Sequence, residues 1–121
     1  MAVIDSGIAD HWDLRSGGGH GYEVGRPRIV YSESFLPDAS PSKRSAFDQH
    51  GHGTHVAGII AGNAWSSTGK WYTRTFRGMA PRASLVNLRV LDERAGGRDS
   101  YVIAAIQRAI QLKDTISTTS G

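Results

Sequence analysis

The sequence contains no cysteine, so the chain can form neither a disulfide bond nor a thiolate metal site, and it has no cysteine nucleophile. It also lacks any apolar run close to the about 20 residues that a membrane-spanning helix needs, and we expect no membrane span. No basic and then apolar leader is visible, so the sequence shows no signal peptide and leaves the cellular location open. The overall composition is that of an ordinary globular protein, with 39% hydrophobic and 21% charged residues.

The excess of positive charge is small, because 14 Lys and Arg residues and 11 Asp and Glu residues give a formal net charge of +3. The arginines are scattered along the chain, without a basic stripe and without interleaved aromatic residues. A nucleic-acid groove requires such clustering. We therefore interpret the basic residues as a solvated surface and expect no nucleic-acid partner.

Apolar runs and turn residues predict strands that alternate with helices. Strands are expected over residues 1–5, 28–31 and 84–91, and helices over residues 52–61 and from about 99 to near 112. Loops are expected over residues 16–25, 32–49 and 63–78. The last helix should bury an apolar face made of Val102, Ile103, Ile106, Ala109 and Ile110. This alternation favours an α/β domain with a parallel sheet and flanking helices.

Two short strings carry the chemistry of the chain. AVIDSGI over residues 2–8 places Asp5 at the end of an apolar run, and HGHGTHVAG over residues 50–58 places His52 at the start of a predicted helix. Taken singly, each has an ordinary explanation, because Asp-Ser-Gly is a frequent turn and a histidine at a helix start is usually structural. Together, in this order and at this spacing, they resemble the aspartate and histidine motifs of the subtilisin-like serine proteases, the subtilases.

The resemblance implies a fold and two catalytic roles. The fold would be a doubly wound, mostly parallel sheet with flanking helices, of which residues 1–121 would form the N-terminal part of a single peptidase domain. Asp5 would orient the imidazole of His52 and stabilise its protonated form, and His52 would act as general acid and base. His55 would be the family's second histidine, packed within the helix in a structural role. A zinc site built on His50, His52 and His55 is the alternative, but the pattern offers no further ligand.

The resemblance also points to binding residues. Leu91, Gly96 and Gly97 match positions that line the substrate cleft in relatives, where the two glycines pair with an extended peptide as an added strand. For Leu91, an ordinary core position is an equal alternative. Asp13 and Asn63 fall where relatives place calcium ligands, although calcium takes six to eight oxygens and only these two are recognisable. We expect a peptide or protein substrate and no cofactor, with calcium at Asp13 and Asn63 as the alternative.

The sequence departs from the family pattern after the predicted last helix. No Gly-Thr-Ser-Met-Ala-like serine motif occurs in the 121 residues, and the chain is polar where a further buried strand is expected. We interpret residues 114–121 as a non-native tail, produced by a frameshift or by truncation. By family the protein would be a serine endopeptidase, and this chain would be inactive without the C-terminal half of the domain. The alternative function is a non-catalytic peptide-binding or regulatory module derived from a protease.

Overall fold

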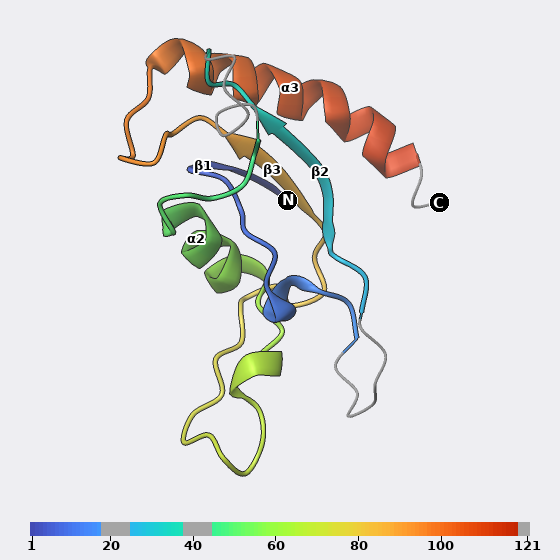
Figure 1. The fold of residues 1–121 in the computed structure, drawn as a ribbon. Helices are drawn as coiled ribbons and strands as arrows, with labels where there is room; N and C mark the ends of the chain where they lie inside the picture. Colours follow the sequence, from blue (N-terminus) through green and yellow to red (C-terminus); the bar gives the residue numbers. More distant parts are fainter. Residues whose placement is uncertain (18–24, 38–44, 119–121) are drawn as a thin grey trace.

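The computed structural model describes residues 1–17, 25–37 and 45–118. In this part of the chain the strands β1 (Ala2–Asp5), β2 (Ile29–Ser34) and β3 (Leu85–Arg89) form a parallel sheet in the order β1-β3-β2. The α-helices are α2 (His52–Ala61) and α3 (Asp99–Thr118), and the short 3-10 helices are η1 (Trp12–Leu14) and η2 (Trp65–Ser67). Figure 1 shows α2 and α3 on opposite sides of the sheet, which is the expected α/β architecture.

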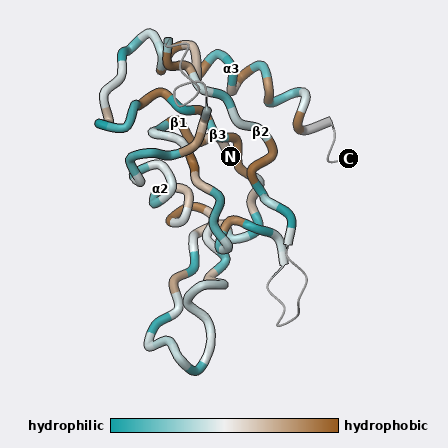
Figure 2. Tube along the Cα trace, viewed as in Figure 1, coloured by the Kyte–Doolittle hydropathy of each residue, from teal (hydrophilic) through white to brown (hydrophobic). Residues whose placement is uncertain are grey.

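The core consists of two layers, one on each face of the sheet. Successive side chains of a strand point to opposite faces. On one face Val3 and Leu85 pack with Ala57 of α2, and on the other face Leu88 packs with Ala105 of α3. Because helices cover both faces, every residue of β3 is buried. The hydrophobic segments in Figure 2 accordingly gather where the strands lie between the helices.

Most of the predicted elements are present, with different bounds. The helix over residues 52–61 matches α2, whereas β3 is shorter than the predicted strand. The predicted loop over residues 32–49 begins too early, because β2 stays paired with β3 as far as Ser34. Backbone pairing with the central strand holds these polar residues in the sheet. Residues 18–24 and 38–44, which belong to two of the predicted loops, lie outside the described part of the chain.

The C-terminal helix is longer than predicted. α3 continues to Thr118 instead of ending near Leu112, and Ile116 packs against the cluster that contains Leu88. Residues 114–118 are therefore helical and do not form an extended polar tail. Their interpretation as non-native sequence stays a prediction, and residues 119–121 lie outside the described part. Within the described residues, no helix is apolar over a length sufficient to cross a membrane.

The predicted buried face of α3 is wrong in part. Ile103, Ile106 and Ile110 are 65%, 48% and 66% exposed, whereas Ala105 is fully buried and Val102 packs against the sheet. The apolar residues of α3 form two adjacent stripes, and the sheet is wide enough to cover only one of them. One stripe contains Val102, Ala105 and Ala109, and the other contains Ile103, Ile106 and Ile110. The sheet covers the stripe that contains Ala105 and leaves the isoleucine stripe in solvent.

Candidate active site

Asp5 is the last residue of β1, at the carboxyl end of the parallel sheet. Its carbonyl oxygen accepts a hydrogen bond from the backbone N–H of Val90 at 2.8 Å, which fixes it against the chain leaving β3. Its side chain is largely buried, and Oδ1 accepts from the backbone N–H of Ser6 at 2.7 Å. Parallel sheets present functional side chains at this edge. The strand and the turn that follows it therefore set the direction of the carboxylate.

His52 opens α2 and reaches the carboxylate of Asp5. Its Nδ1 lies 2.8 Å from Oδ1 and 2.9 Å from Oδ2. Because a carboxylate only accepts hydrogen bonds, Nδ1 carries the hydrogen and Nε2 is the basic nitrogen. The side chain of His52 is 59% exposed, so Nε2 belongs to a ring that a reactant can approach. The structure thus brings together the two residues that the strings single out.

The pKa of His52 is raised above its ordinary value. The hydrogen bond to Asp5 is the largest cause, the charge of Asp5 adds to it, desolvation opposes it, and the charge of Asp48 contributes in the same direction as Asp5. Protonated His52 therefore stabilises the folded chain. This contribution is complete below the ordinary histidine pKa of about 6.5 and is lost as the pH rises through the raised value.

Two glycines let α2 approach β1 this closely. Gly51 has a φ of 103°, in the left-handed region, where the chain turns into α2. A Cβ atom on Gly53 would lie 2.2 Å from the carbonyl oxygen of Gly7 and 3.2 Å from Oδ1 of Asp5. The glycines on both sides of His52 are therefore needed for different reasons. Gly51 adopts a backbone conformation that favours glycine, and Gly53 leaves no room for a side chain.

We expect Gly53→Ala to force α2 away from β1 and to lower the free energy of unfolding by about 1–3 kcal/mol, the usual cost of overpacking. Gly58→Ala is the matched control, because it adds the same methyl group to the same helix where no atom lies within 4 Å of the new Cβ. That variant should be stabilised by roughly 0.5–1 kcal/mol, because alanine favours a helix over glycine. Urea denaturation measures both, and equal effects would contradict the close approach at Gly53.

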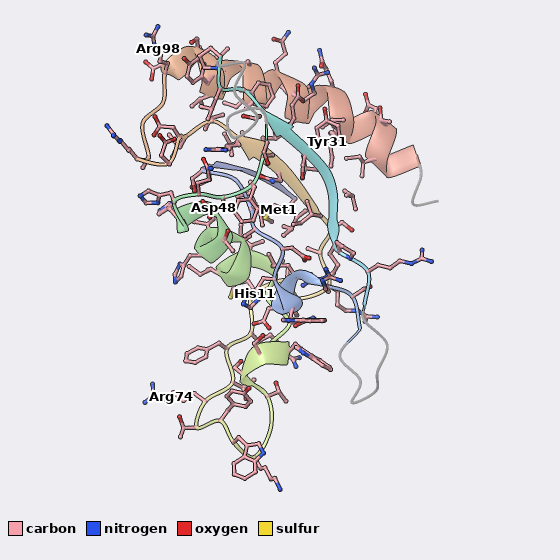
Figure 3. The ribbon with its side chains drawn as sticks, in the orientation of Figure 1. Met1, His11, Tyr31, Asp48, Arg74 and Arg98 are labelled. Carbon is pink, nitrogen blue, oxygen red and sulfur yellow. The ribbon has the colours of Figure 1, made fainter. Side chains whose placement is uncertain are left out.

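Ser6 and Asp48 belong to the same site and were missed by sequence reasoning. The buried hydroxyl of Ser6 donates to Oδ1 of Asp48 at 2.8 Å and accepts from the backbone N–H of Gly53 at 2.9 Å. Figure 3 shows Asp48 near the N-terminal end of α2. A signal for Asp48 was available, since an acidic residue just before a helix often meets its free N–H groups. The sequence holds no comparable signal for Ser6.

The other two histidines of the second string have different surroundings. The ring of His50 lies edge-on to that of His52, with 6.4 Å between their centroids. His55 is exposed and lines a hollow of about 800 Å³ between α2 and residues 75–79, so its expected packing within the helix is wrong. The reason is that α2 turns Gly53 and Ala57 to the interior. In the described ranges, no group of three or more His, Cys, Asp or Glu residues is arranged to hold a metal ion.

The three expected substrate-binding residues lie just beyond β3. Leu91 is partly buried and packs against the cluster on the α3 side of the sheet. A Cβ atom on Gly97 would lie 2.8 Å from Cδ2 of Leu91 and 2.6 Å from the carbonyl oxygen of Val90, so these residues are in contact. Gly96 and Gly97 line a hollow of about 240 Å³ beside Tyr101. The structure therefore places Leu91 in contact with Gly97, and it places Gly96 and Gly97 at a concave part of the surface.

The two residues expected as calcium ligands, Asp13 and Asn63, form hydrogen bonds within the chain. Oδ1 of Asp13 accepts from the backbone N–H of Ser66 at 2.7 Å, and Oδ1 of Asn63 accepts from the backbone N–H of Trp65 at 3.0 Å. The guanidinium of Arg28 donates to the carbonyl oxygens of Asp13, Ala61 and Ala83. The buried guanidinium of Arg28 thus bonds backbone carbonyl oxygens near Asp13, and calcium at Asp13 and Asn63 stays a prediction.

Arg28 and Arg89 also correct the interpretation of the basic residues as a solvated surface. Both are buried. Arg89 donates to the carbonyl oxygen of Leu91 at 3.1 Å, to that of Ser45 at 2.9 Å, and to the side chain of Gln49 at 3.1 Å. A buried charge needs such partners. Arg89 therefore ties the segment that leads into α2 to the end of β3.

Comparison with known proteins agrees with this geometry. The subtilase family is matched over residues 1–120. Subtilisin E of Bacillus subtilis is 38% identical over 123 residues, which cover 100% of this chain and 26% of that protein. An intracellular serine protease of Paenibacillus polymyxa is 34% identical over 123 residues, covering 100% of this chain and 32% of that protein. Serine protease AprX of Bacillus subtilis is 32% identical over 114 residues, covering 94% of this chain and 21% of that protein. The chain spans no more than about a third of these relatives, and it belongs to the subtilase family of peptidases.

Proposed function

We propose that this chain forms part of the catalytic domain of a serine endopeptidase, with Asp5 and His52 as two members of a Ser-His-Asp triad. The observation that carries the proposal is the 2.8 Å contact between Nδ1 of His52 and Oδ1 of Asp5. The contact lies at the edge of a parallel sheet where such sheets carry their sites. The relatives, which are serine proteases by name, support the class of reaction.

In the proposed reaction His52 moves the proton and Asp5 holds the ring. Nε2 of His52 takes the proton of a serine hydroxyl as the oxygen attacks the peptide carbonyl, and later gives it to the leaving amine. Asp5 keeps the hydrogen on Nδ1 and stabilises the imidazolium, which agrees with the raised pKa of His52. The nucleophile would come from sequence other than these 121 residues, which contain no Gly-Thr-Ser-Met-Ala-like string.

The proposed substrate is an extended peptide that lies along Gly96 and Gly97. Gly96 already bonds Asp92 through its backbone, since its N–H donates to Oδ1 of Asp92 and its carbonyl oxygen accepts from the backbone N–H of Asp92, both at 2.8 Å. Gly97 is therefore the residue whose backbone groups would pair with an added strand. The hollow beside Tyr101 gives room for a substrate side chain, and Leu36 and Pro37 give it apolar lining. These features support peptide binding at the end of β3.

A chimera tests the proposal, in which residues 1–113 replace the matching segment of subtilisin E. We expect it to hydrolyse a peptide ester and to form a fluorophosphonate adduct on the serine that the subtilisin E part supplies. The 121-residue chain alone should do neither. If the probe labelled a serine of the 121-residue chain alone, the proposal that the nucleophile lies in other sequence would be wrong. A folded chimera that binds peptide without hydrolysis or labelling would favour the non-catalytic peptide-binding module.

A further inference from the structure

Asp48 is a buried carboxylate four residues before His52. It is only 6% exposed. Its Oδ1 accepts from the backbone N–H groups of His50 at 3.0 Å and Gly51 at 2.8 Å, and its Oδ2 accepts from the backbone N–H of Thr54 at 2.9 Å. These bonds satisfy donors around the start of α2, as a helix cap does. Capping alone does not account for the other contacts of this carboxylate.

Two hydroxyl groups connect Asp48 to the turn after β1. Ser6 in that turn donates to Oδ1 of Asp48 at 2.8 Å and accepts from the backbone N–H of Gly53 in α2 at 2.9 Å. Thr54 in α2 donates to Oδ2 of Asp48 at 2.6 Å and accepts from the backbone N–H of Ala9 in the turn at 2.9 Å. Each hydroxyl therefore bonds across the two segments: the Ser6 hydroxyl, in the turn, accepts from α2, and the Thr54 hydroxyl, in α2, accepts from the turn. We call Ser6, Asp48 and Thr54 the Asp48 clamp.

The Asp48 clamp joins the two elements that carry Asp5 and His52. Ser6 follows Asp5 directly, and its backbone N–H donates to Oδ1 of Asp5. Gly53 follows His52 directly, and its backbone N–H donates to the hydroxyl of Ser6. A movement of α2 that lengthened the contact between Asp5 and His52 would therefore also strain the clamp. Misplacement of reacting groups by about 1 Å can lower a rate about 10²-fold, so such a link has a direct consequence for catalysis.

We propose that Asp48 is a positioning residue for the Asp5–His52 pair, and that its carboxylate holds α2 against the turn after β1 through the hydroxyls of Ser6 and Thr54. The inference rests on the proposed function, in which Asp5 and His52 carry the reaction. A carboxylate suits the role because both of its oxygens accept, whereas an amide offers a single accepting oxygen and two donors that the clamp cannot use.

The charge of Asp48 persists over a wide pH range. Burial raises the pKa of Asp48, but the hydrogen bonds from Thr54, Gly51 and Ser6 outweigh burial and hold the pKa well below its ordinary value. The resulting stability is present above the ordinary aspartate pKa of about 3.9 and is lost as the pH falls through the depressed value.

The groups around His52 are Asp5 on β1, the ring of His50 and the charge of Asp48. A test must therefore separate the charge of Asp48 from its positioning role.

Titration of His52, followed by NMR on the 121-residue chain, makes that separation. One readout is the pKa of the His52 ring, and the other is the Nδ1–H proton resonance, which is visible while the hydrogen bond to Asp5 protects it from exchange. Thr54→Val removes one hydroxyl and leaves the charge of Asp48, and Thr54→Ser is the matched control that keeps the hydroxyl. We expect the resonance in the unchanged chain and in Thr54→Ser, and its loss in Thr54→Val and Asp48→Asn.

The pKa of His52 should follow the same pattern. In Thr54→Val it should fall towards the value in Asp5→Asn, because the imidazolium loses its aligned partner although Asp48 stays charged. An unchanged resonance together with an unchanged pKa in both Thr54→Val and Asp48→Asn would overturn the proposal. If Asp48→Asn does not fold, Ser6→Ala decides the question, because it removes the other hydroxyl and should also abolish the resonance.

Asp5→Asn separates failure of the clamp from failure of the proposed function. Loss of a carboxylate in contact with the ring should lower the pKa of His52, because the hydrogen bond to Asp5 is the largest cause of its raised value. If Asp5→Asn leaves this pKa unchanged, the Asp5–His52 pair is absent in solution and the proposed function fails with it. If Asp5→Asn lowers the pKa and the clamp variants do not, the pair stands and only the positioning role of Asp48 is wrong.

Discussion

In the chimera with subtilisin E, His52→Ala is expected to lower kcat by about 10⁶ and Asp5→Ala by about 10⁴. Subtilisin is itself the standard example in which losses of this size follow removal of the base and of its carboxylate. The effect of His52→Ala corresponds to roughly 8 kcal/mol of transition-state stabilisation. It is the larger effect because the serine then has no base, whereas without Asp5 the base persists in an unfavourable orientation. Steady-state hydrolysis of a peptide ester measures both.

His55→Ala is the matched control for these variants. It removes an imidazole three residues further along α2, from an exposed position at the rim of a hollow. We expect kcat to stay within a few-fold of the unchanged chimera, because surface changes away from packed or paired groups have small effects. Hydrolysis that persisted in both His52→Ala and Asp5→Ala would show that a different base carries the reaction. A large loss in His55→Ala alone would make that residue the base.

The Asp5–His52 pair was predicted from the resemblance of its two strings to the subtilase motifs, because the two residues lie 47 residues apart and only the backbone around each has local determinants. An apolar run that ends at Asp5 predicts a strand that delivers the carboxylate to the sheet edge. Glycines on both sides of His52 predict a sharp entry into a closely packed helix, and the structure explains them by the φ of Gly51 and by the contact between Gly53 and Gly7. Backbone geometry of this kind favours glycine in the sequence, since a larger residue at these positions is strained or crowded.

The Asp48 clamp could not be predicted, because its partners are distant in sequence and the family resemblance gave Ser6, Asp48 and Thr54 no shared role. Ser6 and Asp48 are 42 residues apart, and Ala9 and Thr54 are 45 residues apart. Serine, threonine and aspartate also bond readily to their own nearby backbone, so their presence beside a turn or a helix start has an ordinary local explanation. Only the packing of α2 on β1 decides that these side chains bond across the two elements.

Burial was hardest to predict where a residue type had two acceptable surroundings. Arg28 is buried although arginine is usually exposed, because backbone carbonyl oxygens surround its guanidinium. Ile103 is exposed although isoleucine is usually buried, because the sheet covers only one of the two apolar stripes on α3. The periodicity of a helix shows which residues share a face, but the width of the surface that covers it depends on the rest of the fold.

Leu88→Ala is expected to lower the free energy of unfolding of the chain by about 2–5 kcal/mol, a large share of the 5–15 kcal/mol typical of a domain. Leu88 has no exposed surface and lies in the central strand within the cluster that packs on α3, so the truncation leaves a cavity that its neighbours can fill only partly. Ile103→Ala is the control: it shortens an exposed side chain of α3 and should change stability by less than about 0.5 kcal/mol. Urea denaturation, followed by circular dichroism, compares the two. If α3 instead buried the face predicted from its apolar spacing, the loss at Ile103 would approach that at Leu88 and would contradict the packing of α3 on the sheet through Ala105.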